Sequence, residues 1–194
     1  EMCIRDRENI DRKKSYVFVA NHQGAFDIFL IYGFLGVPIK WVMKAGIAKI
    51  PFVGAACRAA GFIFVDNSTP KAAARSVLEA ERSLKNGASV VVFPEGSRTY
   101  NGKMIRFKKG AYQMAADQHL QIVPITLNGP FDVLPIGSLN IHRHKMEMVI
   151  HPPIPTEGMD ASHKGLQQMA DKTQDIIASA LCCLLYTSPS PRDT

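Results

Sequence analysis

The sequence predicts an α/β fold in which a mostly parallel central sheet is flanked by helices. Short apolar runs of strand length alternate along the chain with longer stretches of helical periodicity. Two of these runs end in polar clusters that contain glycine, residues 21–27 and 93–98, which is typical of chemistry-bearing turns at the carboxyl ends of parallel strands. A length of 194 residues with 46% hydrophobic residues fits one domain with a sizeable core.

Five apolar runs and one alternating segment predict the strands. The run at 16–20 is short and continuous, as expected of a buried strand. The run at 88–93 is also continuous in apolar residues, so we expect it near the centre of the sheet. The segment 145–150 alternates apolar with other side chains, which favours an edge strand. In chain order, the predicted strands are 16–20, 39–43, 62–65, 88–93, 121–127 and 145–150.

Helical segments fill the gaps between the strands. The longest apolar run covers about a dozen residues, whereas a bilayer span needs roughly 20, so we interpret it as a core helix that ends in a turn at Gly36 and Pro38. A later helix has serine or threonine as its N-cap, Pro70 in its first turn and a stop at Gly87. The predicted helices are 26–35, 45–50, 53–60, 70–86, 110–118 and 162–181.

The two ends of the chain look foreign to this pattern. Residues 1–7 and 182–194 share no periodicity with their neighbours and resemble translated sequencing-adapter read-through, so we exclude them and place the domain at 8–181. We therefore expect the native N-terminus, with any membrane anchor, to be missing. Cys57 is then the one cysteine of the domain, which gives no disulfide framework or zinc spacing and favours a reducing compartment. The domain keeps the net charge of +6, which suits an anionic partner.

The first polar cluster pairs a base with an acid. His22 titrates near neutrality, and Asp27 could hold its imidazole in one tautomer and stabilise the protonated ring. A histidine with an aspartate five places on arises by chance in roughly one such chain in four. The alternative is a histidine near a helix start, with Asp27 in the first turn where the helix dipole favours an acid.

The second polar cluster carries a carboxylate and a guanidinium. Arg98 could fork onto a phosphate, and Glu95 could accept a hydrogen bond from a substrate hydroxyl. The alternative is a Glu95–Arg98 pair that only holds a loop. Basic residues follow, and those beside the helix start at 110 either form a solvated face or serve phosphate. They are Lys103, Arg106, Lys108 and Lys109.

Four blocks in order resemble the glycerolipid acyltransferases, closest to the bacterial 1-acyl-sn-glycerol-3-phosphate acyltransferases. The blocks are residues 21–27 with a histidine and an aspartate separated by four residues, 61–66, 93–98 and 123–125. The resemblance covers roughly residues 14 to 155. One departure is Asn67, where the family usually has an arginine associated with the substrate phosphate. Either Lys44, Arg98 or Lys108 compensates, or the acceptor head group differs.

The resemblance implies a glycerol-3-phosphate acyltransferase-like fold and a membrane enzyme of phospholipid synthesis. It would move a fatty acyl group from an acyl thioester, of coenzyme A or acyl carrier protein, to the free hydroxyl of a 1-acyl-glycerol-3-phosphate. His22 would be the general base and Asp27 its orienting acid, with no metal and no cofactor. The implied place is the cytoplasmic face of a bacterial inner membrane, on an anionic surface. The implied substrate-binding residues are Glu95, Gly96, Ser97, Arg98, Lys44 and Lys108.

Other classes of function remain as alternatives. The acceptor could be another lysophospholipid head group. A non-catalytic module that binds anionic lipid would not need His22 and Asp27 together. A metal hydrolase could use His142, His144 and His151, but their surroundings are basic and their spacing fits no standard metal motif. Nucleic-acid binding has only the net charge in its favour, so we expect no nucleic-acid partner.

Overall fold

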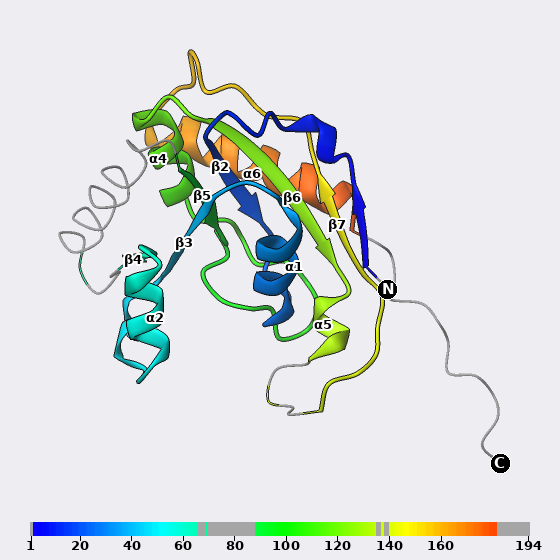
Figure 1. Cartoon of the computed structure of the whole chain (residues 1–194). Helices are drawn as coiled ribbons and strands as arrows, with labels where there is room; N and C mark the ends of the chain where they lie inside the picture. The colour runs from blue at the N-terminus through cyan, green and yellow to red at the C-terminus, as the bar shows by residue number, and fades with distance from the viewer. Residues whose placement is uncertain (1, 66–68, 70–87, 135–136, 138–139, 182–194) are drawn as a thin grey trace.

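A mostly parallel sheet confirms the predicted fold class (Figure 1). The computed structural model describes residues 2–65, 69, 88–134, 137 and 140–181. Within these residues the strand order is β1-β7-β6-β2-β5-β3-β4, and β6 with β7 is the antiparallel pair. The strands are β1 Met2–Arg5, β2 Tyr16–Ala20, β3 Ile39–Lys44, β4 Ile63–Val65, β5 Ser89–Val92, β6 Gln121–Asn128 and β7 Met146–Ile150.

Helices cover both faces of the sheet, with α1 on one face and α4 with α6 on the other (Figure 1). Each face has its own apolar core, because side chains alternate along the strands. In β2, Val17 and Val19 pack towards α4 and α6, whereas Phe18 and Ala20 pack towards α1. The described helices are η1 Arg7–Asn9, α1 Phe26–Phe34, η2 Ala45–Lys49, α2 Val53–Ala59, α4 Gly110–Asp117, α5 Pro130–Val133 and α6 His163–Ser179.

The predicted strands at the centre of the sheet are confirmed. Every residue of β2 and of β5 is buried, including Ser89, as expected of strands at the centre of a parallel sheet. The last helix, α6, begins as predicted after Ser162, whose Oγ accepts a hydrogen bond from the N–H of Gly165 at 3.1 Å. The predicted helix at 70–86 and the tail at 182–194 lie outside the described residues.

Three expectations differ from the structure at the edges of the fold. Residues 2–5 do not stand outside the domain, because β1 pairs in parallel with β7. For the same reason β7 is not an edge strand. A four-residue strand is too short to show periodicity, so the sequence pattern did not reveal it. The segment after β3 is a 3-10 helix, and the short helix α5 was not predicted.

Helix α1 packs on the core with only one side. This corrects the interpretation of its apolar sequence as a helix buried in the core. Asp27, Leu30 and Ile31 are buried against the sheet. The opposite side of the helix exposes Phe29 and Tyr32, at 67% and 62% of their surfaces. The helix is therefore apolar all round but covered on one side in the part of the chain that the structure describes. No helix among the described residues is both long enough and apolar enough to cross a bilayer.

Candidate active site

The two polar clusters meet at one edge of the sheet. They follow β2 and β5, which are adjacent parallel strands whose carboxyl ends lie together. The N–H of His22 donates to Glu95 Oε1 at 2.7 Å. The N–H of Thr99 donates to the carbonyl oxygen of His22 at 3.0 Å. The second turn thus holds both the N–H and the carbonyl group of His22, so the two clusters lie in direct contact.

His22 and Asp27 form a close pair. The Nδ1 atom of His22 lies 2.7 Å from Asp27 Oδ2, and the Asp27 side chain is fully buried while 17% of the His22 side chain is exposed. Asp27 Oδ2 also accepts the N–H groups of Gln23 and Gly24, at 2.7 and 2.9 Å. One carboxylate oxygen therefore both shapes the turn and holds the ring. Because this contact occupies Nδ1, Nε2 is the ring nitrogen left to face a substrate.

Both carboxyl groups of the site lie in an environment that opposes their ionisation. Burial raises the pKa of Asp27, and hydrogen bonds from His22, Gly24 and Gln23 oppose that rise. Burial also raises the pKa of Glu95. Hydrogen bonds from the N–H groups of Ile105 and His22 favour its charged form and partly oppose this rise. Perturbed acids beside a histidine are typical of sites that move protons.

Glu95 bridges two segments of backbone. Its Oε1 binds the N–H of His22, and its Oε2 accepts the N–H of Ile105 at 2.8 Å. The residue is only 3% exposed. These contacts give Glu95 a bridging role that the sequence did not predict, and its expected contact with a substrate hydroxyl stays a prediction. Among the described residues no ion pair joins Glu95 to Arg98, so the loop-holding pair is not formed.

The basic residues surround the second turn. The N–H of Lys108 donates to the carbonyl oxygen of Pro94 at 3.0 Å. Its Nζ lies so close to Gly96 that a Cβ placed on this glycine would be 2.7 Å from it. Gly96 also has φ +76°, which favours glycine. The ammonium group of Lys108 therefore lies over the turn.

The remaining predicted binding residues lie around the same turn and at the neighbouring strand end. Ser97 and Arg98 are partly buried within the turn. Lys44 is the exposed last residue of β3, the strand beside β5. No hydrogen bond or ion pair of the described residues joins Lys44 to Glu95 or Lys108. The structure thus gathers Glu95, Gly96 and Lys108, whereas Lys44 lies exposed at the end of the neighbouring strand.

Three residues of the site had no role in the sequence interpretation. The side-chain amide of Asn21 exchanges two hydrogen bonds with the backbone of Leu127 on β6, at 2.9 and 2.8 Å. An asparagine directly after a buried strand was a usable signal. Phe93 stacks on His22, with ring centroids 4.0 Å apart. Thr99, which holds the carbonyl of His22, had no signal in the sequence.

The histidines of the metal-hydrolase alternative do not assemble into a site. No group of three potential metal ligands is clustered in the described residues. His151 Nε2 lies 2.8 Å from Thr126 Oγ1, and burial lowers the pKa of His151. His142 and His144 lie outside any strand, in the segment before β7.

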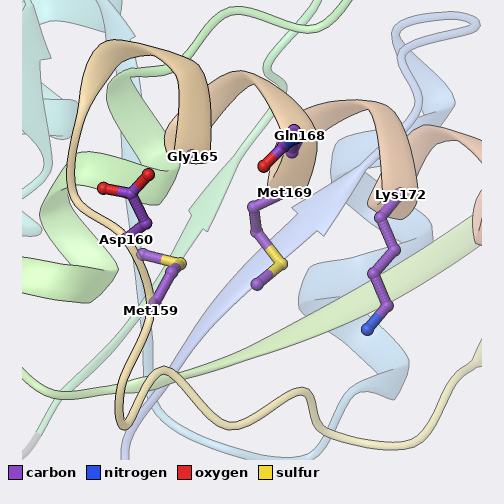
Figure 2. A pocket seen from close by; sticks show the side chains of 6 residues that line it. All are labelled: Met159, Asp160, Gly165, Gln168, Met169 and Lys172. Atoms are coloured by element: carbon purple, nitrogen blue, oxygen red, sulfur yellow. The ribbon is translucent and has the colours of Figure 1, made fainter.

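A hollow lies away from the His22–Asp27 pair. It opens between α6 and the segment before it, on the face of the sheet opposite α1 (Figure 2). None of its lining residues belongs to either polar turn. They are Met159, Asp160, Gly165, Gln168, Met169 and Lys172.

Comparisons with known proteins agree on one family. The family model described as Acyltransferase matches residues 1–128. A chloroplastic 1-acyl-sn-glycerol-3-phosphate acyltransferase of Arabidopsis thaliana is 38% identical over 139 residues, covering 71% of this chain and 39% of the relative. A 1-acyl-sn-glycerol-3-phosphate acyltransferase of Chlamydomonas reinhardtii is 31% identical over 183 residues, covering 93% of this chain and 53% of the relative. The chain thus spans about half of these relatives or less.

A solved structure has the same fold. The crystal structure of the 1-acyl-sn-glycerophosphate (LPA) acyltransferase PlsC from Thermotoga maritima superposes with a TM-score of 0.78 at 28% identity. The superposition covers 98% of this chain and 74% of that protein.

Proposed function

Because this chain belongs to the acyltransferase family, we propose that it acylates the free hydroxyl of a 1-acyl-glycerol-3-phosphate with an acyl thioester as donor. The observation that carries the proposal is the His22–Asp27 pair, at 2.7 Å, held by the turn that follows β5. The relatives named for this acceptor support the choice of substrate.

The proposed reaction uses His22 as a general base. An alcohol is a poor nucleophile at neutral pH, so His22 Nε2 removes the hydroxyl proton as the oxygen attacks the thioester carbonyl. Asp27 stabilises the imidazolium that forms, as the acid of a hydrolase triad does. The tetrahedral intermediate then collapses, the carbon–sulfur bond breaks and the thiolate leaves with the proton from His22. No covalent acyl-enzyme and no cofactor is required, and coenzyme A and acyl carrier protein are both suitable thiols.

The basic turn suits the phosphate of the acceptor. The ammonium group of Lys108 lies over Gly96, and Arg98 belongs to the same turn. A guanidinium and an ammonium are the side chains that bind phosphate in proteins. In this proposal they compensate for Asn67, which lies outside the described residues. Another lysophospholipid head group is the alternative acceptor.

The apolar surface beside the site suits a membrane. Exposed apolar side chains lie on α1 and between η2 and α2, elements that follow the carboxyl ends of β2 and β3 (Figure 1). With the net charge of +6 they favour an anionic lipid surface, which for a bacterial protein would be the cytoplasmic face of the inner membrane. These side chains are Ile28, Phe29, Tyr32, Ile50, Phe52 and Val53.

Product analysis tests the reaction directly. Labelled acyl thioester and lysophosphatidic acid should give labelled phosphatidic acid on thin-layer chromatography. His22→Ala should lower the rate by ~10²–10⁴. The exposed His142 offers a matched control, because His142→Ala removes an imidazole outside the site. Near-normal turnover by His22→Ala would refute the mechanism, and lipid binding without product would favour a non-catalytic module. Parallel reactions with other lysophospholipids decide the head group.

Vesicle binding tests the membrane surface. Binding to anionic vesicles should exceed binding to neutral ones and should weaken as salt rises. Equal binding to both kinds of vesicle would contradict an electrostatic contribution.

A further inference from the structure

Three aromatic rings form a column that ends on His22. The Phe93 ring stacks on the His22 imidazole with centroids 4.0 Å apart and planes 10° from parallel. On its other side lies Trp41, with centroids 5.5 Å apart and planes at 24°. Trp41 is 3% exposed, so the far end of the column is anchored in the core.

The register of the sheet produces this column. Val91 of β5 lies between its partners Phe18 on β2 and Trp41 on β3. Side chains two residues apart share a face, so Phe93 continues the line of Val91 and His22 continues that of Phe18 and Ala20. Neighbouring strands lie about 4.8 Å apart, which is close to the stacking distance of two flat rings. The column therefore depends on the same strand order that brings the two turns together.

We propose that Phe93 is a positioning residue for His22, which fixes the plane of the imidazole and stabilises its protonated form through the π face. This inference rests on the proposed role of His22 as general base. The contact with Asp27 fixes one atom of the ring and leaves rotation about that contact free. The stacked phenyl ring removes this rotation and directs Nε2 towards the acceptor. A cation over an aromatic face is also stabilised, so the stack favours the imidazolium that forms in the reaction.

Substitutions of Phe93 test the inference through kinetics. Phe93→Leu removes the π face and should lower kcat roughly 3- to 30-fold, with KM for the acyl thioester little changed. The midpoint of the acid limb of the pH profile of kcat/KM should move down by roughly half a pH unit, because the protonated ring loses a stabilising contact. Phe93→Tyr keeps the aromatic face and should restore both values.

A spectroscopic signature separates positioning from packing. A phenyl ring stacked at 4.0 Å shifts the Cε1–H resonance of His22 upfield in NMR spectra. That shift should disappear in Phe93→Leu and remain in Phe93→Tyr. Phe34 packs, partly buried, on the same core and offers Phe34→Leu as the matched control, with unchanged kinetics and His22 resonance. The thermal unfolding temperature, followed by far-UV circular dichroism, reports whether each variant keeps its fold. Phe93→Met replaces Phe93→Leu if the latter fails to fold.

The outcomes distinguish positioning of His22 by Phe93 from a role of Phe93 in packing alone. A folded Phe93→Leu or Phe93→Met with wild-type kcat and acid-limb midpoint overturns the inference. So does a slow variant whose midpoint is unchanged and which tyrosine does not rescue, because packing alone then explains it. In either case inactivity of His22→Ala leaves the proposed function intact. Full activity of His22→Ala instead refutes the proposed function itself.

Discussion

The two oxygen atoms of the Asp27 carboxyl group have different hydrogen-bond partners. Oδ2 meets the imidazole of His22 and two backbone N–H groups, whereas Oδ1 is buried and has no hydrogen-bond partner among the described residues. The hydrogen bonds that shape the turn and the one that orients the His22 ring therefore converge on one atom. Leaving Oδ1 without a partner costs stability, so we infer that the site keeps this acid for its chemistry.

Asp27→Asn should separate these two roles. The amide oxygen can still accept the N–H groups of Gln23 and Gly24, so the turn should form. An amide cannot stabilise an imidazolium as a carboxylate does, so kcat should fall by roughly 10²–10⁴. The measurements are kcat and the thermal unfolding temperature. Asp132, which is about half exposed, provides the control Asp132→Asn. An active Asp27→Asn would show that the carboxylate charge is not needed.

The pH dependence of stability should report the buried acids. Burial raises the pKa of Asp27 and of Glu95 above their values in the unfolded chain. These groups therefore add stability that is fully present below their unfolded values, about 4, and is lost as pH rises through the raised folded values. The free energy of unfolding of the wild type relative to Asp27→Asn should thus decline with rising pH. Denaturant titrations between pH 4 and 8 measure it, and a difference that stays constant would contradict the sign.

Glu95→Gln should weaken the link between the turns. Each oxygen of Glu95 accepts a backbone N–H, from His22 and from Ile105. Glutamine can replace only one of these acceptors, and its amide N–H₂ would face the other N–H. We expect a loss of about 1–3 kcal/mol in the free energy of unfolding, together with a lower kcat. Hydrogen exchange at the N–H groups of His22 and Ile105 should quicken. Unchanged exchange at both positions would contradict the bridging role.

At the scale of elements, a glycine allows the first turn to approach α5. A Cβ placed on Gly24 would lie 2.7 Å from the carbonyl oxygen of Pro130, which is backbone and cannot easily move. Gly24→Ala should therefore push residues 21–27 away from α5, lower stability by roughly 1–3 kcal/mol and reduce activity. Gly33 in α1 is the matched control, because a Cβ there would meet nothing within 4 Å. Gly33→Ala should stabilise the helix by about 0.5–1 kcal/mol with unchanged activity. Similar effects of both substitutions would contradict this reading of the turn.

The helices and strands that could be predicted are those marked by a pattern within their own residues, such as an apolar run or an N-cap residue. Strand β2 and helix α1 are apolar runs of the lengths typical of a buried strand and a helix, and Ser162 marks the start of α6. Strand β1 could not be predicted, because four residues form a strand only where β7 offers a free edge. The outer face of α1 could not be predicted either, since composition does not say what covers a helix.

The site was predictable in its residues and much less in its contacts. His22 and Asp27 lie five residues apart, so a local motif could indicate their pairing. The bridge from Glu95 to His22 spans 73 residues of sequence and exists only because β2 and β5 are neighbours in the sheet. The same holds for the stack of Phe93 on His22. Such contacts depend on strand order and register, which a single sequence does not encode in any local pattern.

At the scale of the whole molecule, chemistry and apolar surface lie at one end of the sheet. The polar turns follow the carboxyl ends of β2 and β5. Exposed aromatic and aliphatic side chains lie on α1, which follows the first turn, and at the start of α2, which comes after the carboxyl end of β3. Phe52 is 90% exposed and Phe29 67%. Leaving such side chains in water is unfavourable, and contact of this end of the molecule with lipid would bury them.

The double substitution Phe29→Ser with Tyr32→Ser should therefore separate membrane binding from catalysis. Both side chains are exposed, so the free energy of unfolding should change little. Loss of two aromatic anchors should weaken binding to anionic vesicles by roughly 10-fold or more, because each removes apolar area that would be buried in lipid. Turnover of a short-chain, monomeric lysophosphatidic acid should stay near the wild-type value, since no hydrogen bond or ring stacking of the described residues joins either side chain to His22 or Asp27. Gln168→Ser, an exposed change on α6 across the sheet, is the control. Undiminished vesicle binding by the double variant would assign the lipid contact to another surface, and a loss of turnover on the monomeric substrate would place α1 in the acceptor site instead.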